Sequence, residues 1–462
     1  MATRDITPAE PRRSLIRHPD FVKLWTAESI SQFGTQVSLL ALPLIAALIL
    51  RVTPFEFGLL GTIEFLPFIL ISLPAGVWVD RLPRRPILIV GDLGRAIALA
   101  SIPVAFALGV LTIWQLYVVG FVTGCLTVFF DVAYQSYLPA LVDRDDLVEG
   151  NSKLEISRSA AQLSGPGAAG LIIGAFTAPV AIVLDSLSFV ASALFIFLIR
   201  KREAPRRREV QAETGKRTSM RQEIAEGLRY VLSHPHLRAI AACTGSSNLF
   251  SNLVFSILIL YLVRDLAFEA EQIGIAFSIG AVGFLLGALT ANRISGRLGV
   301  GPTIIVSAAL FGPALILVPL APVGQELAFV AAAGFITSFS TAVYNITQVS
   351  YRQAITPQRM QGRMNATMRF IVWGTIPIGT TLAGFLGGVI GLTQTIWIGV
   401  IGSMFIFLPV LLSPVRSLRK MPEPVDEQEP GEGEASAAIE TLGDAIDESP
   451  RPGRGSPSPD DP

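Results

Sequence analysis

The chain has 462 residues, of which 51% are hydrophobic and only 16% are charged, and its mean hydropathy is +0.55. Soluble domains carry about 25% charged residues, so this composition indicates an integral membrane protein. The formal net charge of zero gives no sign of a nucleic-acid partner.

The residue types also argue against several kinds of chemistry. The two cysteines, Cys125 and Cys243, each lie inside an apolar run and predict neither a disulfide framework nor a zinc site. The sequence holds no Walker-type phosphate-binding loop, and no nucleophile, base and orienting group occur together. We therefore expect no metal, no cofactor and no enzymatic activity.

Apolar stretches long enough to cross a bilayer follow one another along the chain. A membrane helix needs about 20 apolar residues, and the first stretch is too long for a signal-peptide core. The sequence therefore predicts an all-α membrane protein with twelve transmembrane helices in two six-helix halves. The predicted spans lie near residues 22–50, 55–79, 86–109, 112–138, 156–176, 178–199, 238–263, 272–292, 301–320, 325–350, 366–391 and 393–413.

The basic residues predict the side of the membrane on which each connection lies. Lys and Arg crowd the connections on one side of the spans, whereas the opposite connections carry only Arg51 and Arg264. Cytoplasmic loops are enriched in Lys and Arg. Both termini are therefore expected to be cytoplasmic, in the inner or plasma membrane of a bacterium.

Changes in composition divide the chain into regions. Between the halves, Ile224, Leu228, Val231 and Leu232 stand at helical spacing, which predicts an amphipathic helix on the inner surface. The end of the chain is rich in Pro, Glu, Asp, Gly and Ser, which is typical of a disordered, solubilising tail rather than a binding module. We expect a monomer. The regions are the cytoplasmic N-terminus (1–20), the N-terminal half (21–199), the cytoplasmic linker (200–237), the C-terminal half (238–415) and the acidic cytoplasmic tail (416–462).

The two predicted halves resemble each other in sequence. Arg158 precedes Pro166 by eight residues, and Arg369 precedes Pro377 by the same spacing, at an offset of 211 residues. Parallel repeats of six spans place the solute path between the halves, near the middle of the membrane.

Two motifs carry a resemblance to a known family. The loop after the second span packs one acid and three arginines between two apolar stretches, and the fifth span carries a line of small residues. The loop reads Gly76-Val-Trp-Val-Asp80-Arg81-Leu-Pro-Arg84-Arg85, and the small residues include Ala161, Gly165-Pro166 and Ala169-Gly170. On these motifs the chain resembles the major facilitator superfamily, within it the drug and siderophore exporter branch of enterobactin-exporter-like and macrolide-efflux-like proteins. The resemblance covers about residues 18–415.

The resemblance implies the major facilitator fold and assigns the loop as a conformational latch. Asp80 would help to hold the halves together in the outward-facing state, with Gly76, Arg81, Arg84 and Arg85 as the rest of the motif. Pro83 stands where the family usually has glycine, which predicts a stiffer turn.

Two charges beyond the loop extend this latch. Asp92 and Arg95, at positions i and i+3 of the third span, can pair with each other or with the loop. Simple neutralisation of one charge by the other is the alternative.

The line of small residues on the fifth span is similar to the antiporter motif of the family. Ser152, Ala161 and Ala169 replace three of its glycines. Small residues allow close helix contact and a Gly-Pro pair permits a kink, and the resemblance implies export rather than uptake. A tight helix contact without directional meaning is the alternative.

Ionisable residues inside the spans cost roughly 2.5–3.5 kcal/mol each at mid-membrane and are expected to face the bundle interior. Asp131 lies closest to mid-span with no basic residue one turn away, so desolvation favours its neutral form and it can exchange a proton. Glu28 resembles acids at this position in several drug/proton antiporters. We expect these two residues to carry protons. Glu64 and Asp185 lie nearer the outer face and are expected to act in proton coupling as half-solvated gates.

Other polar residues within the spans are candidates for the solute cavity. Glu155 and Arg158 are expected to form an internal pair. Neutral amides in membrane helices often only bond to neighbouring helices, and this alternative stays open. The candidates for the cavity wall are Gln32, Gln135, Asn248, Asn252, Tyr344, Asn345, Gln348 and Arg369.

Together these features predict a secondary active transporter that exports a small amphipathic compound in exchange for protons, by alternating access. A drug, an antibiotic or a siderophore-type metabolite would suit such a cavity. The expected partners are the small-molecule substrate, protons and the lipid bilayer. An uptake symporter or passive facilitator of a small metabolite is the first alternative, and a non-transporting membrane scaffold or receptor is the second.

Overall fold

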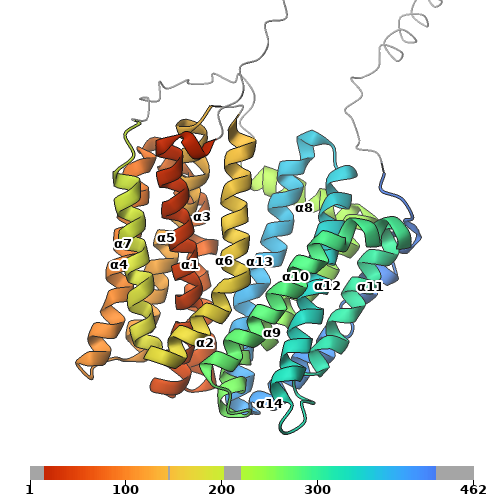
Figure 1. Ribbon diagram of the computed structural model, residues 1–462. Coiled ribbons are helices and arrows are strands. Elements are labelled where there is room, and N and C mark those ends of the chain that lie inside the picture. Colours follow the sequence, from red (N-terminus) through yellow and green to blue (C-terminus); the bar gives the residue numbers. More distant parts are fainter. Residues whose placement is uncertain (1–14, 144–145, 202–219, 423–462) are drawn as a thin grey trace, which may run out of the picture.

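The computed structural model describes residues 15–143, 146–201 and 220–422 (Figure 1). These residues form helices and connections and contain no strand, which confirms the all-α class. The described chain begins and ends at the same end of the helix bundle, which we call the terminal end. The opposite end is called the distal end.

The N-terminal half begins with the short 3-10 helix η1 (Leu15–Arg17). Local signals start its membrane helices: Thr53 and Glu56 form a capping box ahead of Pro54, the first residue of α2. The helices of this half are α1 (Pro19–Leu44), continued by the π-helical turn η2 (Ile45–Ile49), α2 (Pro54–Leu70), α3 (Ser72–Arg81), α4 (Arg84–Ala107), α5 (Ile113–Leu141), α6 (Leu147–Phe176) and α7 (Ala178–Phe197).

The linker and the C-terminal half follow. The expected linker helix forms as α8 (Met220–Ser233), with Val231 buried and Leu228 and Leu232 exposed. The side chain of Ile224 lies outside the described residues. The helices of the C-terminal half are α9 (Pro235–Arg264), α10 (Ala270–Leu298), α11 (Val300–Ile316), α12 (Glu326–Ala354), α13 (Gln358–Val389), α14 (Leu392–Ser403), α15 (Leu408–Leu411) and the 3-10 helix η4 (Pro414–Ser417).

Each of the twelve predicted spans coincides with one helix or with two consecutive helices. Within the described ranges, nine helices are long and apolar enough to cross a membrane. The other three spans differ in simple ways. The second is divided between α2 and α3, after Pro67 inside α2, the fifth lies in α6, which begins with a polar stretch, and α11 has only 17 residues. The structure therefore supports a multi-pass bundle, and the count of twelve crossings stays a prediction.

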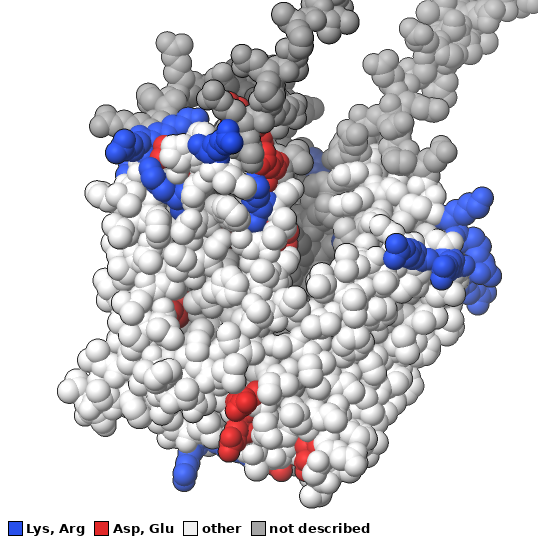
Figure 2. Space-filling view, in the orientation of Figure 1, with Lys and Arg blue, Asp and Glu red and all other residues white. Residues whose placement is uncertain are grey.

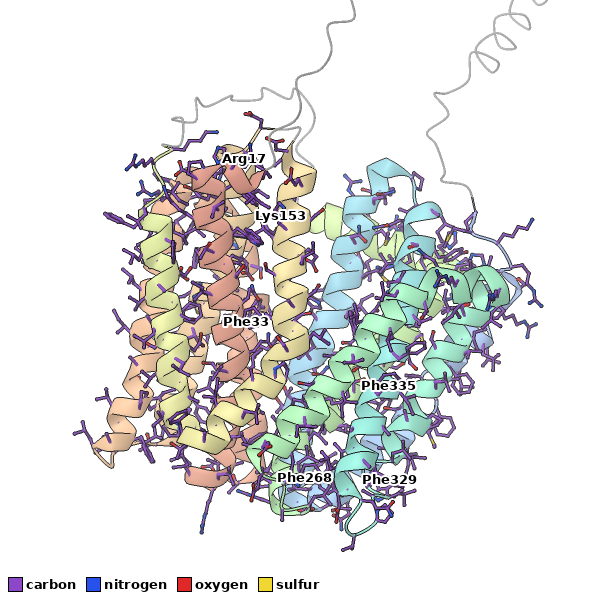
Figure 3. The ribbon with its side chains drawn as sticks, in the orientation of Figure 1. Arg17, Phe33, Lys153, Phe268, Phe329 and Phe335 are labelled. Atoms are coloured by element: carbon purple, nitrogen blue, oxygen red, sulfur yellow. The ribbon has the colours of Figure 1, made fainter. Side chains whose placement is uncertain are left out.

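Charged side chains lie mainly at the two ends of the bundle. Figure 2 shows Lys and Arg gathered mostly toward the terminal end and an almost uncharged band between the ends. Figure 3 places Arg17 and Lys153 toward the terminal end, Phe33 at mid-height, and Phe268 and Phe329 near the distal end. This distribution suits a protein whose middle faces lipid.

The two halves pack as separate bundles, and two helix pairs make most of the contact between them. Within the N-terminal half α1 and α4 both pack on α7, and within the C-terminal half α12 packs on α10 and α11. Across the halves α6 packs on α10 and α2 packs on α13. In a duplicated six-helix repeat these two pairs are equivalent, because α2 corresponds to α10 and α6 to α13.

Glycines bring the helices together at both of these crossings. A Cβ atom on Gly58 would lie 2.7 Å from the Cα of Gly384, and one on Gly170 would lie 2.9 Å from the Cα of Gly274. Gly58 and Gly274 are each the fifth residue of their helix. Two equivalent glycine contacts agree with the internal repeat inferred from the sequence, since small residues let backbones approach closely in lipid.

The hydrophobic cores show where the halves join. One core is shared, and it contains Leu60 and Ile182 from the N-terminal half with Ile257 and Leu315 from the C-terminal half. The second core belongs to the N-terminal half alone, and the third belongs to α8 and the C-terminal half alone. At the distal end, Arg264 of α9 also donates a hydrogen bond to the carbonyl of Val52 in the other half (2.5 Å). The halves are therefore packed together at the distal end and separate toward the terminal end.

Candidate functional site

The candidate functional site is a cavity of about 690 Å³ inside the N-terminal half, at its face toward the other half. Its described walls come from α1, α2, α4, α5, α6 and α7, and Trp373 of α13 closes one side. The charged-type side chains on these walls are Glu28, Glu64, Arg95, Asp131, Arg158 and Asp185. The structure thus brings together all four acids that the sequence nominated for proton coupling.

Glu28 lies where this cavity meets a second one. Gln32 Nε2 donates to Glu28 Oε1 (2.7 Å), and Glu28 Oε2 is buried without a hydrogen-bond partner among the described residues. The second cavity, of about 420 Å³, also contains Tyr134 and Arg158 in its wall and continues along the first turns of α6 to Asn151. Because α6 begins at the terminal end, the two cavities together form a path toward that end.

Asp131 and its neighbours stand in the same region. Asp131 lines the larger cavity and lies within the electrostatic reach of Arg95 and Arg158. Glu155 and Arg158 both line the second cavity, but no ion pair joins them in the described part of the chain. The expected internal pair is therefore absent from the described structure, and Arg158 lines the larger cavity together with Asp131.

Asp185 is buried, with 1% of its surface exposed, so it is not the half-solvated gate that the sequence suggested. Ser38 donates a hydrogen bond to Asp185 Oδ2, and Ser188 donates to Oδ1 (3.0 Å). Gly34 makes room for this cluster, because a Cβ atom there would collide with Ser188 and Asp185. Asp185 thereby ties α7 to α1 at the wall of the cavity.

Asp92 and Arg95 form a buried ion pair within α4, with 2.5 Å between Oδ1 and Nη2. The Arg95 guanidinium also lies between the rings of Phe130 and Phe189, 4.3 and 4.2 Å from their centres. Stacking on two aromatic faces adds to the stabilisation of this cation away from water. Of the two expected partners for these charges, each other and the Asp80 loop, the structure shows the first.

Glu64 lies deeper in the cavity, on α2. Gly120 of α5 leaves the space for its side chain: a Cβ atom on Gly120 would lie 2.8 Å from Glu64 Cγ. Its Oε1 atom is buried and has no hydrogen-bond partner among the described residues. Glu64 therefore lines the cavity as a half-buried side chain with one enclosed oxygen, and its expected role as a half-solvated gate stays a prediction.

The remaining predicted cavity residues divide between the halves. Gln32 and Gln135 line the large cavity in the N-terminal half. The side chain of Arg369 lies outside the described residues, and Gln348 is buried, with Oε1 lacking a hydrogen-bond partner in the described structure. A separate pocket of about 270 Å³ in the C-terminal half is lined by Asn248, Asn252, Tyr344 and Asn345.

The antiporter-like motif on α6 contacts both halves. A Cβ atom on Gly165 would collide with Gln36 of α1, in its own half. Gly170 approaches the carbonyl of Ala270 on α10, and the Pro166 carbonyl approaches Gly274 of the same helix. Ala161 and Ala169 are fully buried. Only the second part of the motif, Pro166 to Gly170, therefore forms a close-packed contact between the halves.

The loop predicted to be a latch is described only in part. The side chains of Asp80 and Arg81 lie outside the described residues, and a Cβ atom on Gly76 would meet nothing within 4 Å. Arg84 is the first residue of α4 and is not among the residues that line the cavity. Arg85 donates hydrogen bonds to the carbonyls of Ile196 (3.3 Å) and Phe197 (2.5 Å), at the end of α7. Arg85 therefore binds within its own half, as a cap on a helix C-terminus.

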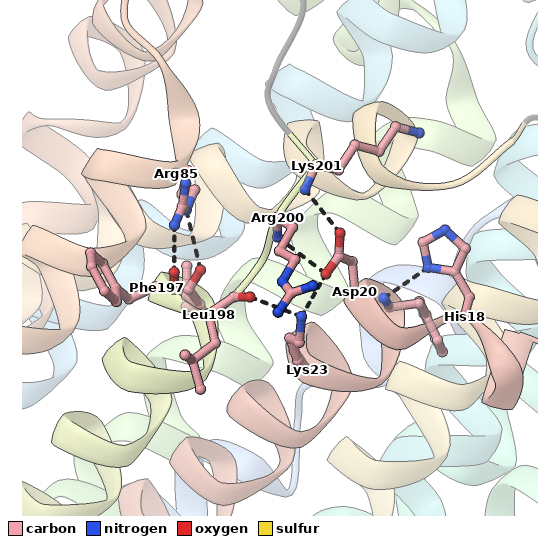
Figure 4. A network of polar contacts seen from close by, with 10 residues as sticks. His18, Asp20, Lys23, Arg85, Phe197, Leu198, Arg200 and Lys201 are labelled. Atoms are coloured by element: carbon pink, nitrogen blue, oxygen red, sulfur yellow. Dashed lines mark hydrogen bonds and ion pairs between the residues drawn. The ribbon is translucent and has the colours of Figure 1, made fainter.

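A network of polar contacts surrounds this cap (Figure 4). Lys23 Nζ donates to the carbonyl of Leu198 (2.8 Å) and pairs with Asp20 (2.8 Å). Asp20 in turn accepts from the backbone N–H groups of Arg200 (3.2 Å) and Lys201 (2.9 Å). The starts of α1 and α4 are thus joined to the end of α7, which holds this end of the N-terminal half as one unit.

Several residues of the site were missed in the sequence. Phe65, Phe68 and Trp373 form part of the cavity wall, and Ser38 and Ser188 bind Asp185. Aromatic and hydroxyl residues are common in membrane helices, so their type alone does not separate a wall from a lipid-facing surface. The spacing of Ser188 three residues after Asp185 was the one available signal.

The fold and the cavity define the class of protein. Two helical halves that meet at one end around a polar, internally lined cavity form a secondary transporter of the major facilitator type. The chain belongs to the transmembrane secretion effector family, whose model matches residues 13–433. It is accordingly a multi-pass membrane transporter of small molecules and not an enzyme.

Comparisons with known proteins agree with this class. The chain is 29% identical to the multidrug efflux pump Tap of Mycolicibacterium fortuitum over 364 residues, covering 75% of this chain and 85% of that protein. It is 23% identical to macrolide efflux protein A of Streptococcus pyogenes over 412 residues, covering 87% and 97%. Among solved structures, a bacterial homologue of the iron transporter ferroportin, in an inward-facing state, matches with a TM-score of 0.69 at 15% identity, covering 87% of this chain and 99% of that one. This last likeness supports the fold.

Proposed function

We propose that this protein exports a small amphipathic compound across a bacterial inner membrane by alternating access, driven by protons that flow inward. The observation that carries the proposal is a cavity lined by four acids that is closed where the two halves share a core, at the distal end. The Lys and Arg residues near the terminal end support a cytoplasmic position for that end. The described conformation would then admit solute from the cytoplasm.

Glu28 and Asp131 are the proposed proton carriers. Both line the cavity, and the Glu28 Oε2 atom lacks a hydrogen-bond partner among the described residues, so it is available to a proton. Arg95 and Arg158 lie within electrostatic reach of Asp131, and Arg95 also acts on Glu28. A proton that neutralises either acid changes the charge balance of the cavity and weakens solute binding. Proton entry is thereby coupled to solute release.

The relatives support the direction of transport. One protein to which this chain is similar is named a multidrug efflux pump, and another is named a macrolide efflux protein. The close contact of Gly170 with α10 joins the antiporter-like motif to the moving interface. In this proposal the Asp80 loop stabilises the outward-facing state, and the monomer is the working unit.

Inverted membrane vesicles test the proposal. Wild-type protein is expected to accumulate an amphipathic dye when a proton gradient is imposed, and an uncoupler should abolish that accumulation. Asp131→Asn and Glu28→Gln should each remove the response to the gradient. Glu271→Gln, which neutralises an exposed acid of α10 outside the cavity, is the matched control and should leave it intact. Gradient-driven transport by both cavity variants would refute the carrier assignment.

A further inference from the structure

Glu64 differs from the other acids of the cavity because nothing in the described structure balances its charge. Its Oε1 atom is buried, and neither an ion pair nor a hydrogen bond reaches that atom among the described residues. By contrast, Glu28 accepts from Gln32 and Asp185 accepts from two serines. Asp131 has two arginines within electrostatic reach.

An uncompensated acid in a protein interior is costly, and proteins pair such groups or use them for binding. Gly120 on the opposing helix keeps a place open for the Glu64 side chain, since any side chain at Gly120 would strike it. The fold thus makes room for this carboxyl group without supplying it with a partner. A ligand that enters the cavity can supply the missing charge.

Aromatic rings surround the same position. Phe65 follows Glu64 in the chain and stacks on Phe68, with 5.4 Å between ring centres. Its ring also meets the edge of Trp373, from the other half, at 6.1 Å. All three rings line the cavity with Glu64. Aromatic faces carry negative potential and attract cations, and they also pack against apolar groups.

The cavity wall as a whole carries more acidic than basic side chains. Four carboxyl side chains and two guanidinium groups face the large cavity, and one of those guanidinium groups, that of Arg95, is already paired with Asp92. An anionic solute would meet surplus negative charge at the aromatic end of the cavity, where Glu64 forms no ion pair with any described cation. A cationic solute would meet a free carboxylate and aromatic faces.

We propose that Glu64 binds the positively charged group of the transported compound, and that the substrates of this protein are organic cations with an aromatic or apolar body. Phe65, Phe68 and Trp373 hold that body. The proposal rests on the transport function proposed above and specifies its substrate class. Because Trp373 comes from the other half, a solute held there contacts both moving parts of the transporter.

Binding of two ions of equal shape and opposite charge tests the proposal. Purified full-length protein in a neutral detergent is equilibrated at pH 8 with radiolabelled tetraphenylphosphonium or with tetraphenylborate. Wild-type protein is expected to bind the phosphonium cation and not the borate anion. Glu64→Gln should weaken binding of the cation by about 30-fold or more, since it removes one member of a buried charge pair.

Three further variants separate charge from structure. Glu64→Asp keeps the carboxylate and should bind the cation more tightly than Glu64→Gln does. Trp373→Leu should weaken binding of the cation while leaving the preference over the anion. Glu271→Gln removes an acid outside the cavity and should bind as the wild type does. An unchanged elution profile in size-exclusion chromatography shows that each variant is folded.

The possible results are distinct. Equal binding by wild type and Glu64→Gln, binding of the borate ion, or binding of neither ion by wild type would overturn the proposal. Glu64-dependent cation binding in a protein that shows no proton-driven transport would leave the proposal standing and refute the proposed function. Proton-driven export of only neutral or anionic dyes would support the proposed function and refute the proposal that the substrates are organic cations.

Discussion

The glycine contacts between the halves lead to a quantitative prediction about conformational switching. A Cβ atom added at Gly58 would lie 2.7 Å from both the Cα of Gly384 and the carbonyl oxygen of Thr380. Both are backbone atoms of α13 that cannot rotate away, so the helices must separate. Overpacking of this kind costs about 1–3 kcal/mol. The cost falls on the described conformation, in which the distal end is closed.

Gly58→Ala should therefore shift the equilibrium toward a conformation with the distal end open, by roughly 5- to 150-fold. Electron–electron distance measurements between spin labels can detect this shift. Trp114→Cys and Val323→Cys suit as label sites, because both side chains are highly exposed and they lie in different halves. The measurement uses a chain whose two native cysteines have been replaced.

Gly61→Ala is the matched control. It lies on the same helix one turn later, and its Cβ would meet only a methyl group of Thr380 at 3.9 Å. On α6 the equivalent variant is Gly170→Ala, and Gly174→Ala is its control. A Cβ atom on Gly174 would meet only the Cβ of Glu271, at 4.0 Å. If Gly58→Ala and Gly61→Ala gave the same distance distribution in folded protein, the glycine contact would not control closure of the distal end.

Three other predictions follow from the described contacts. Arg95→Met should destabilise the protein by about 3–5 kcal/mol, because Asp92 is left buried without its partner. Adding Asp92→Asn to the same chain should restore much of this stability. Thermal unfolding in detergent measures both effects. Asp80→Asn should slow transport without lowering the amount of protein in the membrane, measured as initial efflux rate against quantitative immunoblotting; a normal rate would remove the latch. Truncation after Pro422 should leave the efflux rate unchanged, and loss of activity would favour a scaffold role for the tail.

The internal repeat shows how far the sequence could go. The equal spacing of Arg158 with Pro166 and of Arg369 with Pro377 indicated a duplication, and the structure shows two equivalent glycine crossings between the halves. The sequence could not indicate which glycines meet. Many glycines in membrane helices face lipid or a neighbour of the same half, and the approach of two backbones depends on helix crossing geometry.

For the acids of the cavity, too, the sequence could nominate the residues but not their roles. Their rarity within apolar spans was enough to nominate Glu28, Glu64, Asp131 and Asp185, because an ionisable side chain in lipid is too costly without a function or a partner. Their individual roles depend on neighbours that are distant in the chain. Ser38 lies 147 residues from Asp185, and no spacing rule connects them.

Composition and hydropathy by themselves determined that this chain is a helical membrane protein with repeated spans, because the bilayer imposes apolar segments of fixed length on any chain that crosses it. Only the tertiary structure decided that Arg85 caps α7 within its own half, that Glu155 and Arg158 do not pair, and that Glu64 is left without a charge partner. The contact partners of a side chain depend on how the helices rotate and cross. Chains with the same hydropathy pattern can adopt different arrangements of this kind.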